Sequence, residues 1–170
     1  MSVTQQLNNG NSGDGVIVNE ATILDAKSVS NVDYYKNGKP LEVGVELTME
    51  IGQAFSQKVC VGGNIEVGKD GKINWSSVMA VKNLLNNLNV KWTGLNPDNS
   101  IPDTVLEQLK GLNVFCISYK SGKIQKDKEG NTTDKTAYSI FREMCLASEG
   151  DKGKQKLRAT FDKALAGGSI

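Results

Sequence analysis

The sequence predicts a mainly β fold of the α+β class, in which a five-stranded Greek-key barrel carries helices inserted between its third and fourth strands. Two observations support this prediction. Three β-rich segments are followed by a helical region and then by two further strand candidates, which a long lysine-rich connection separates. The chain then ends in an amphipathic segment that is typical of a helix.

The first strands are predicted from their apolar pattern. Residues 16–29 are rich in Val, Ile and Thr, the composition of a long strand. Asn37-Gly38 then signals a type I′ hairpin, because both central residues of that turn need positive φ. The second strand has a period of two, which predicts that its alternate apolar residues face the core: Val43, Val45, Leu47, Met49 and Ile51.

The third strand and the inserted helices follow. Residues 57–61 form the predicted third strand, with Lys58 pointing outward, and Asp70-Gly71 signals another hairpin. Residues 78–88 then change to a helical period, and a shorter helix is expected at about residues 102–110.

The last two strands enclose a long connection. Residues 114–119 and 137–141 read as an antiparallel pair. The connection between them exceeds the length of about 12–15 residues that ordinary loops have, so we expect a projecting β-ribbon. Beyond it, residues 155–166 place Leu157 and Phe161 on one helical face, which should dock on the barrel or on a partner.

Composition limits the class of protein. The 170 residues fit one domain, which we place at residues 16–170 after a flexible lead-in at residues 1–15. The net charge of +1 provides no global field for nucleic acid, so any anion-binding surface must be local. No apolar run approaches the roughly 20 residues that span a bilayer, and the three cysteines form no disulfide framework. We therefore expect a cytoplasmic protein without membrane contact.

The sequence gives little support to an enzyme. Histidine is absent, which removes the commonest general base and metal ligand. No phosphate-binding loop motif is present, and the carboxylates of Glu42, Glu46 and Glu50 are too widely spaced along one strand to share an ion. We expect no catalytic residue, no metal and no cofactor.

The predicted order of elements matches the OB-type barrel, which binds oligonucleotides through its strand 1–2 and strand 4–5 loops. It resembles the OB-fold single-stranded-DNA-binding proteins of bacteriophages over residues 16–141. The resemblance includes the glycine-containing hairpin, the helices around residues 75–88 and the phrase Leu-Lys-Gly-Leu-Asn-Val-Phe at residues 109–115. It implies a role in DNA replication or recombination in the host cytoplasm. Members commonly end in an acidic tail that recruits replication enzymes, whereas residues 166–170 here are Ala-Gly-Gly-Ser-Ile.

The candidate site combines lysines with tyrosines in and beside the two loops. Lysines can follow the phosphates, and aromatic faces can stack bases without sequence preference. The candidate nucleic-acid-binding residues are Tyr34, Tyr35, Lys36, Lys39, Lys58, Tyr119, Lys120, Lys123, Lys126, Lys128, Lys135 and Tyr138. We expect both loops to rise beside the same opening of the barrel.

Structural alternatives stand beside each of these assignments. A lysine-rich hairpin can simply be a solvated surface. Tyr34 and Tyr35 can cover a hydrophobic edge, Tyr119 and Tyr138 can pack as a cross-strand pair, and Trp75 and Trp92 fit the core or its edge. The pattern of the second strand also predicts that three glutamates line its outer face, where they would repel phosphates: Glu42, Glu46 and Glu50.

The leading hypothesis is a single-stranded-DNA-binding protein of phage type, which binds without sequence specificity and without covalent chemistry. Its expected partners are single-stranded nucleic acid, with DNA favoured, and a homo-oligomer or replication proteins. The alternative is a protein-interaction or virion-assembly module that does not bind nucleic acid.

Overall fold

The computed structural model describes residues 15–34, 36, 38, 40–52, 55–63, 66–67, 69, 73–74, 78–92, 94–126, 129 and 131–168. Several predictions therefore lie outside the described residues: those for residues 1–14 and for Tyr35, Asn37, Lys39, Asp70-Gly71, Trp75 and Lys128.

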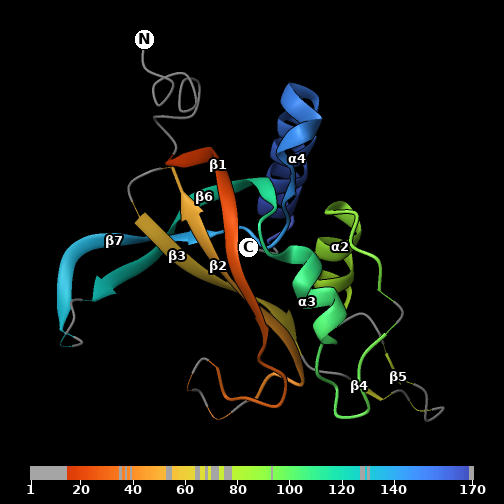
Figure 1. Ribbon diagram of the computed structural model, residues 1–170. Coiled ribbons are helices and arrows are strands. Elements are labelled where there is room, and N and C mark those ends of the chain that lie inside the picture. The colour runs from red at the N-terminus through yellow and green to blue at the C-terminus, as the bar shows by residue number, and fades with distance from the viewer. Residues whose placement is uncertain are drawn as a thin grey trace.

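Five antiparallel strands form a nearly closed barrel, which confirms the predicted fold class (Figure 1). Their order in the sheet is β3-β2-β1-β6-β7, and the short strand β8 also pairs with β6. The strands are β1 (Val16–Ser28), β2 (Val43–Ile51), β3 (Phe55–Gly63), β6 (Asn113–Lys126), β7 (Thr132–Ile140) and β8 (Cys145–Leu146). At the seam between β3 and β7, Gln57 Nε2 donates a 3.4 Å hydrogen bond to the carbonyl oxygen of Tyr138.

The barrel interior follows the alternation that the sequence predicts for β2. All five apolar residues of that strand are at most 4% exposed, and they pack with Ala21, Ile23 and Ala26 of β1. Burying one aliphatic side chain of this kind contributes about 1.5–3 kcal/mol. A register shift between Ile23 and Asp25 keeps the inward set of β1 aligned with that of β2.

The predicted helices lie between β3 and β6 in the chain. They are α2 (Met79–Asn87) and α3 (Asp103–Leu109), and their buried side chains belong to the main core. A small separate hairpin, β4 (Glu66–Val67) with β5 (Ile73–Asn74), precedes α2. None of the helices in the described part of the chain is long and apolar enough to cross a membrane.

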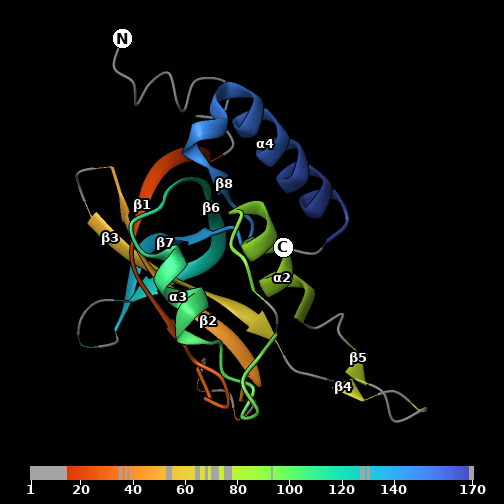
Figure 2. The ribbon, with the colours of Figure 1, turned by 45° about the vertical axis from the view of Figure 1, so that its right-hand side comes forward.

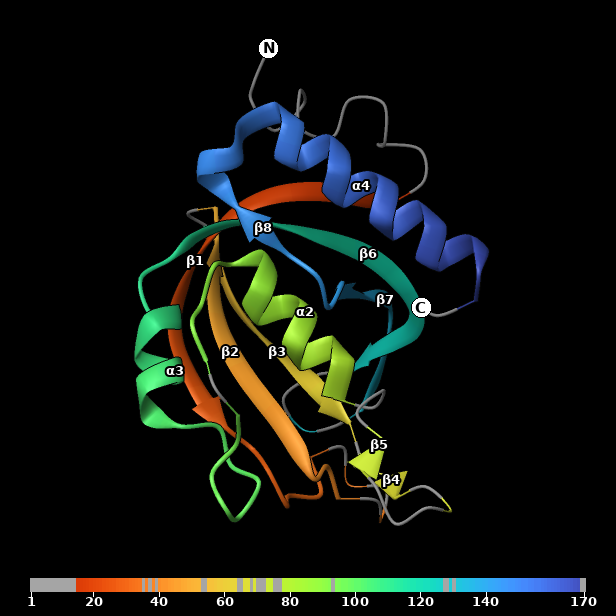
Figure 3. The same cartoon turned by 90° about the vertical axis from the view of Figure 1, so that its right-hand side faces the viewer.

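The C-terminal helix α4 (Gly150–Ala166) lies across the outside of β1 and β6 (Figures 2 and 3). It starts five residues earlier than the predicted residue 155. Leu157 and Phe161 pack into a second apolar cluster with side chains on the outer face of these strands: Val16, Val18, Phe115 and Ile117. The prediction that this helix docks is therefore confirmed, and its docking surface is the barrel itself.

The predicted ribbon is present as the extended ends of β6 and β7, which curve away from the barrel (Figure 1). Beyond Lys120 the two strands still pair, with Ile124 opposite Thr136 and Lys126 opposite Thr132.

Candidate nucleic-acid interface

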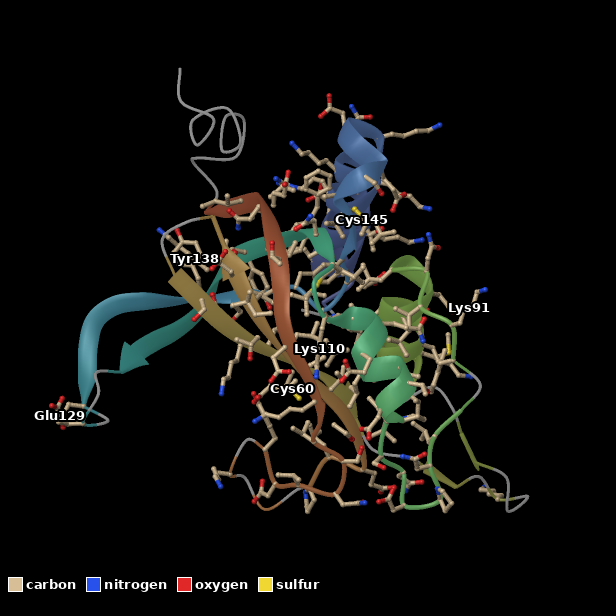
Figure 4. All side chains as sticks on the ribbon, viewed as in Figure 1. Cys60, Lys91, Lys110, Glu129, Tyr138 and Cys145 are labelled. Carbon is tan, nitrogen blue, oxygen red and sulfur yellow. The ribbon has the colours of Figure 1, made fainter. Side chains whose placement is uncertain are left out.

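One face of the barrel is formed by the outward side chains of β1, β2 and β3. The register aligns Lys27 with Glu46, and Glu46 with Cys60. Two residues further along, Thr48 is aligned with Lys58. Side chains of aligned residues on one face lie within contact range. Figure 4 labels Cys60 on this part of the barrel, well away from Cys145 near α4. We call this surface the β1–β3 outer face.

Glu46 is the buried centre of the β1–β3 outer face. The residue is 7% exposed. Its Oε1 lies 3.7 Å from Lys27 Nζ and 3.8 Å from Lys58 Nζ, and its Oε2 accepts a 2.7 Å hydrogen bond from the Tyr34 hydroxyl. A buried carboxylate is costly unless cations or donors compensate it, and here two ammonium groups and a hydroxyl do so.

The sequence predicts that three glutamates line the outer face of β2, and two of them lie on it. Glu46 is buried there between two lysines and Glu50 is exposed, whereas Glu42 precedes β2 and is half-buried. The pattern of the strand gave the direction of each side chain but could not show which cations lie across the neighbouring strands. Because two ammonium groups surround one carboxylate, the centre of the face carries excess positive charge.

The connection between β1 and β2, residues 29–42, folds back over the end of this face. Val32 and Leu41 form an isolated antiparallel bridge within it. Tyr34 is half-buried, because its hydroxyl reaches Glu46. Lys36 is exposed, in a left-handed conformation with φ 56°. Tyr34 is thus anchored on the barrel, whereas Lys36 points to solvent.

Two glycines make this close packing possible. Gly44 and Gly62 are opposite each other in β2 and β3. A Cβ on Gly62 would lie 2.3 Å from the carbonyl oxygen of Val43, and a Cβ on Gly44 would lie 2.9 Å from Cγ2 of Val29. Side chains at either position would push apart β2, β3 and the β1–β2 connection.

Tyr138 and Lys120 lie together at the base of the ribbon. The register pairs Lys120 of β6 with Tyr138 of β7, so both side chains are on one face. Lys120 is exposed, and Tyr138 is 41% exposed, one of the largest apolar surfaces in the described chain. Lys123, Lys126 and Lys135 belong to the ribbon strands further out. This end of the ribbon therefore offers an aromatic ring beside a cation.

Tyr119 lies on the opposite face from Tyr138, so the proposed cross-strand pair of the two tyrosines is not formed. The register pairs Tyr119 with Ser139 instead. The Tyr119 ring packs 5.4 Å, between centroids, from that of Phe161 in α4. Tyr119 therefore helps to dock the helix, because it shares the outer face of β6 with Phe115 and Ile117. The β6–β7 register, one position away from the expected one, places Tyr138 on the other face.

The two lysine-bearing loops do not rise beside one opening, so that expectation is wrong. The ribbon leaves the barrel where Tyr119 pairs with Val16, and the β1–β2 connection starts after Ser28. These positions are the opposite ends of β1, separated by about 40 Å of strand at about 3.3 Å per residue. Figure 1 shows the ribbon tip on the left and the connection at the bottom.

Strand β3 joins the two regions instead. It approaches the ribbon base through the Gln57–Tyr138 hydrogen bond, and at its other end Gly63 pairs with Val43, where the connection enters β2. Lys58 lies between these ends on the β1–β3 outer face. The face therefore reaches the β1–β2 connection at one end. At the ribbon base it does not continue onto Tyr138 and Lys120, because Lys120 alternates with Val114 and Cys116 of the core and lies with Tyr138 on the inner side of the sheet.

Lys27 on this face and Lys110 beside it are two cations that sequence reasoning missed. Lys110, just after α3, lies 3.6 Å from Asp25 of β1, and its bond to Glu107 raises its pKa. Lys27 follows the register shift in β1, so its direction could not be inferred from alternation along the strand. No local motif marks either lysine.

Trp92 is half-buried against the core, as predicted. It borders a cavity of about 540 Å³ between α2 and α3, and the side-chain amide of Gln108 holds the backbone of Lys91 beside it through bonds of 3.0 and 2.8 Å. A second cavity, of about 440 Å³, lies between α2 and α4. Neither cavity opens on the β1–β3 outer face.

The described residues contain no group of three or more His, Cys, Asp or Glu side chains that could hold a metal ion. No protein-family model matches the chain, and neither curated proteins nor solved structures show a significant similarity to it.

Proposed function

We propose that the protein binds single-stranded nucleic acid, with DNA favoured, along the β1–β3 outer face, and that it acts in DNA replication or recombination. The observation that carries this proposal is the pair of lysines, Lys27 of β1 and Lys58 of β3, that flank the buried carboxylate of Glu46 on this face. Lysines supply phosphate contacts along the face, and the exposed Tyr138 ring, on the inner side of the ribbon base, supplies a surface on which a base can stack. The mechanism is equilibrium binding without covalent chemistry.

The proposal also fits the small net charge of +1. Affinity for a polyanion needs a local excess of cations, and it decreases with salt as those cations displace counterions. The lysine-rich ribbon and the centre of the outer face both provide such an excess. The bacteriophage OB-fold binding proteins, which the sequence resembles, are the expected class.

Fluorescence anisotropy with labelled oligo-dT at two salt concentrations tests the proposal. We expect binding at low salt that weakens as salt rises, with a slope of about −0.7 per neutralised phosphate. Changing Lys123, Lys126 and Lys128 together to Glu should abolish most of it. The matched control changes Lys91, Lys152 and Lys163 to Glu, three exposed lysines outside both the β1–β3 outer face and the ribbon, and should bind more tightly than the ribbon variant.

The proposal is overturned if folded protein binds no oligo-dT at low salt. It also fails if the two triple variants lose affinity equally, because long-range charge alone would then explain the binding.

The second candidate is a protein-interaction or virion-assembly module. The exposed apolar side chains Leu24 and Val32, which are 48% and 45% exposed, favour it. Light scattering separates the two functions. An oligomer that survives the ribbon charge reversal and shows no oligo-dT binding would support the second candidate.

A further inference from the structure

Glu46 occupies a position that suits an anionic ligand. Its Oε1 is buried, lies between the ammonium groups of Lys27 and Lys58, and accepts no hydrogen bond from the residues that the structure describes. The distances of 3.7 and 3.8 Å are too long for hydrogen bonds, so the attraction is Coulombic. The lysines hold Glu46 without using their N–H donors on it.

We propose that Lys27 and Lys58 form a phosphate subsite, and that Glu46 fills it as an internal anion until a ligand phosphate takes its place. This inference rests on the proposed function, of which it names one contact site and its regulation.

The two lysines are free to turn to a ligand. Their side chains are 60% and 59% exposed, while that of Glu46 is 9% exposed. The two ammonium groups, one on each side of Glu46, are therefore accessible to solvent, whereas the carboxylate between them is buried. A phosphate arriving from solvent can accept short, charge-assisted hydrogen bonds from both ammonium groups, which are stronger than the contacts that Glu46 makes.

Tyr34 links this exchange to the β1–β2 connection. When the lysines turn to a phosphate, the buried Glu46 loses its cations, a costly state for a carboxylate. The Tyr34 hydroxyl, which donates to Oε2, still compensates part of that cost and keeps Glu46 beside the subsite.

Glu46→Gln tests the internal anion directly. The amide keeps the shape of the side chain and can still accept from Tyr34, but it no longer competes for the lysines. We expect oligo-dT to bind about two- to fivefold more tightly, the range that partly exposed ion pairs contribute. The control is Glu50→Gln, the same charge change on the same outer face of β2, where we expect less than about twofold because an exposed charge is screened.

The contribution of the two lysines to binding is tested by replacing Lys27, Glu46 and Lys58 together. Changing Lys27 and Lys58 alone would leave Glu46 buried without a partner, so Lys27→Gln, Glu46→Gln and Lys58→Gln are combined. We expect weaker binding of oligo-dT and a salt slope smaller in magnitude by about 1.4, or 0.7 for each lysine.

The outcomes separate this inference from the proposed function. If oligo-dT binds but Glu46→Gln and Glu50→Gln act equally, or the triple variant keeps the wild-type slope, the subsite is overturned and the function stands. If wild type binds no oligo-dT, the proposed function falls. The subsite is then decided by calorimetry with tripolyphosphate: binding that the triple variant loses supports it, and no difference between the two proteins overturns it.

Discussion

The outer surface of the barrel has two halves that differ in chemistry, although β1 contributes to both. Near its start, β1 points Val16 and Val18 outward, and α4 covers them. Near its end, it points Lys27 outward, and 60% of that side chain is exposed. We call these the covered half and the open half.

The comparison shows that the two ends of one strand can have different roles: the start of β1 packs against a helix, and its end contributes to the proposed binding face. In the covered half the outward residues are apolar, so they contribute stability only because a helix removes them from water. In the open half the outward residues include the charged Lys27, Glu46 and Lys58, and the buried Glu46 is compensated by its neighbours. We therefore expect changes in the covered half to act on stability, and changes in the open half to act on binding.

The largest expected effect comes from removing the Phe161 side chain, which packs α4 against the covered half. This residue is 1% exposed, and its ring packs against the rings of Phe141 and Tyr119 at 5.2 and 5.4 Å. Phe161→Ala should lower the free energy of unfolding by about 3–5 kcal/mol. Urea denaturation measures the loss.

The matched control is Leu165→Ala on the same helix. Leu165 is 56% exposed, so its removal should change stability by less than about 0.5 kcal/mol. If Phe161→Ala were equally mild, α4 would not be docked on the barrel in solution.

The next effect concerns close packing beneath the open half. Gly62→Ala places a Cβ against the Val43 carbonyl oxygen, which cannot move without disturbing the β2–β3 ladder. We expect a loss of about 1–3 kcal/mol, the usual cost of overpacking. Gly44→Ala should cost less, because the Val29 side chain that it meets can shift. Thermal unfolding of both variants checks this order, and a larger loss for Gly44→Ala would contradict it.

A third prediction compares Tyr119 and Tyr138, two tyrosines at the base of the ribbon that lie on opposite faces of it. Tyr138→Ala should weaken oligo-dT binding by about 1–3 kcal/mol, the contribution of one stacked base, with little change in unfolding. Tyr119→Ala should do the reverse, because its ring supports α4. Binding and urea denaturation are measured on both variants. Equal losses of affinity would show that the two faces of the ribbon are not distinct.

The architecture was predictable because the spacing of apolar residues along the chain indicated each strand and helix. The alternation from Val43 to Ile51 fixed the inward face of β2, and the helical period around Leu84 placed α2 correctly. The end of the chain was also predictable, since Leu157 and Phe161 lie four residues apart on one helical face.

The site was less predictable because it depends on register between distant segments. Lys27 and Lys58 meet Glu46 through the alignment of three strands, which no spacing along the chain records. The same is true of Tyr138: one position in the β6–β7 register decided whether it lay beside Tyr119 or beside Lys120. Sequence patterns give the direction of a side chain, and tertiary register gives its partner.

The smallest effect compares two buried cysteines, Cys116 in the barrel interior and Cys145 beside α4, with Cys60 on the open half. Burial raises the pKa of Cys116, in β6, from 9.0 to about 12, and burial together with the nearby Glu149 carboxylate raises that of Cys145 to about 11. The half-buried Cys60 lies on the open half. At pH 8 iodoacetamide should therefore modify Cys60 first in the folded protein, and bound oligo-dT should slow that reaction.

The buried thiols also predict how stability depends on pH. Above pH 9.0 the unfolded chain ionises its thiols while folded Cys116 stays protonated. The folded state then binds more protons than the unfolded state, so the free energy of unfolding falls as pH rises, by at most about 1.4 kcal/mol per pH unit for this thiol. Urea titrations at pH 8 and pH 10 measure the fall, and Cys116→Ala should reduce it. An unchanged slope in that variant would assign the pH dependence to other groups and show that the Cys116 thiol does not govern it.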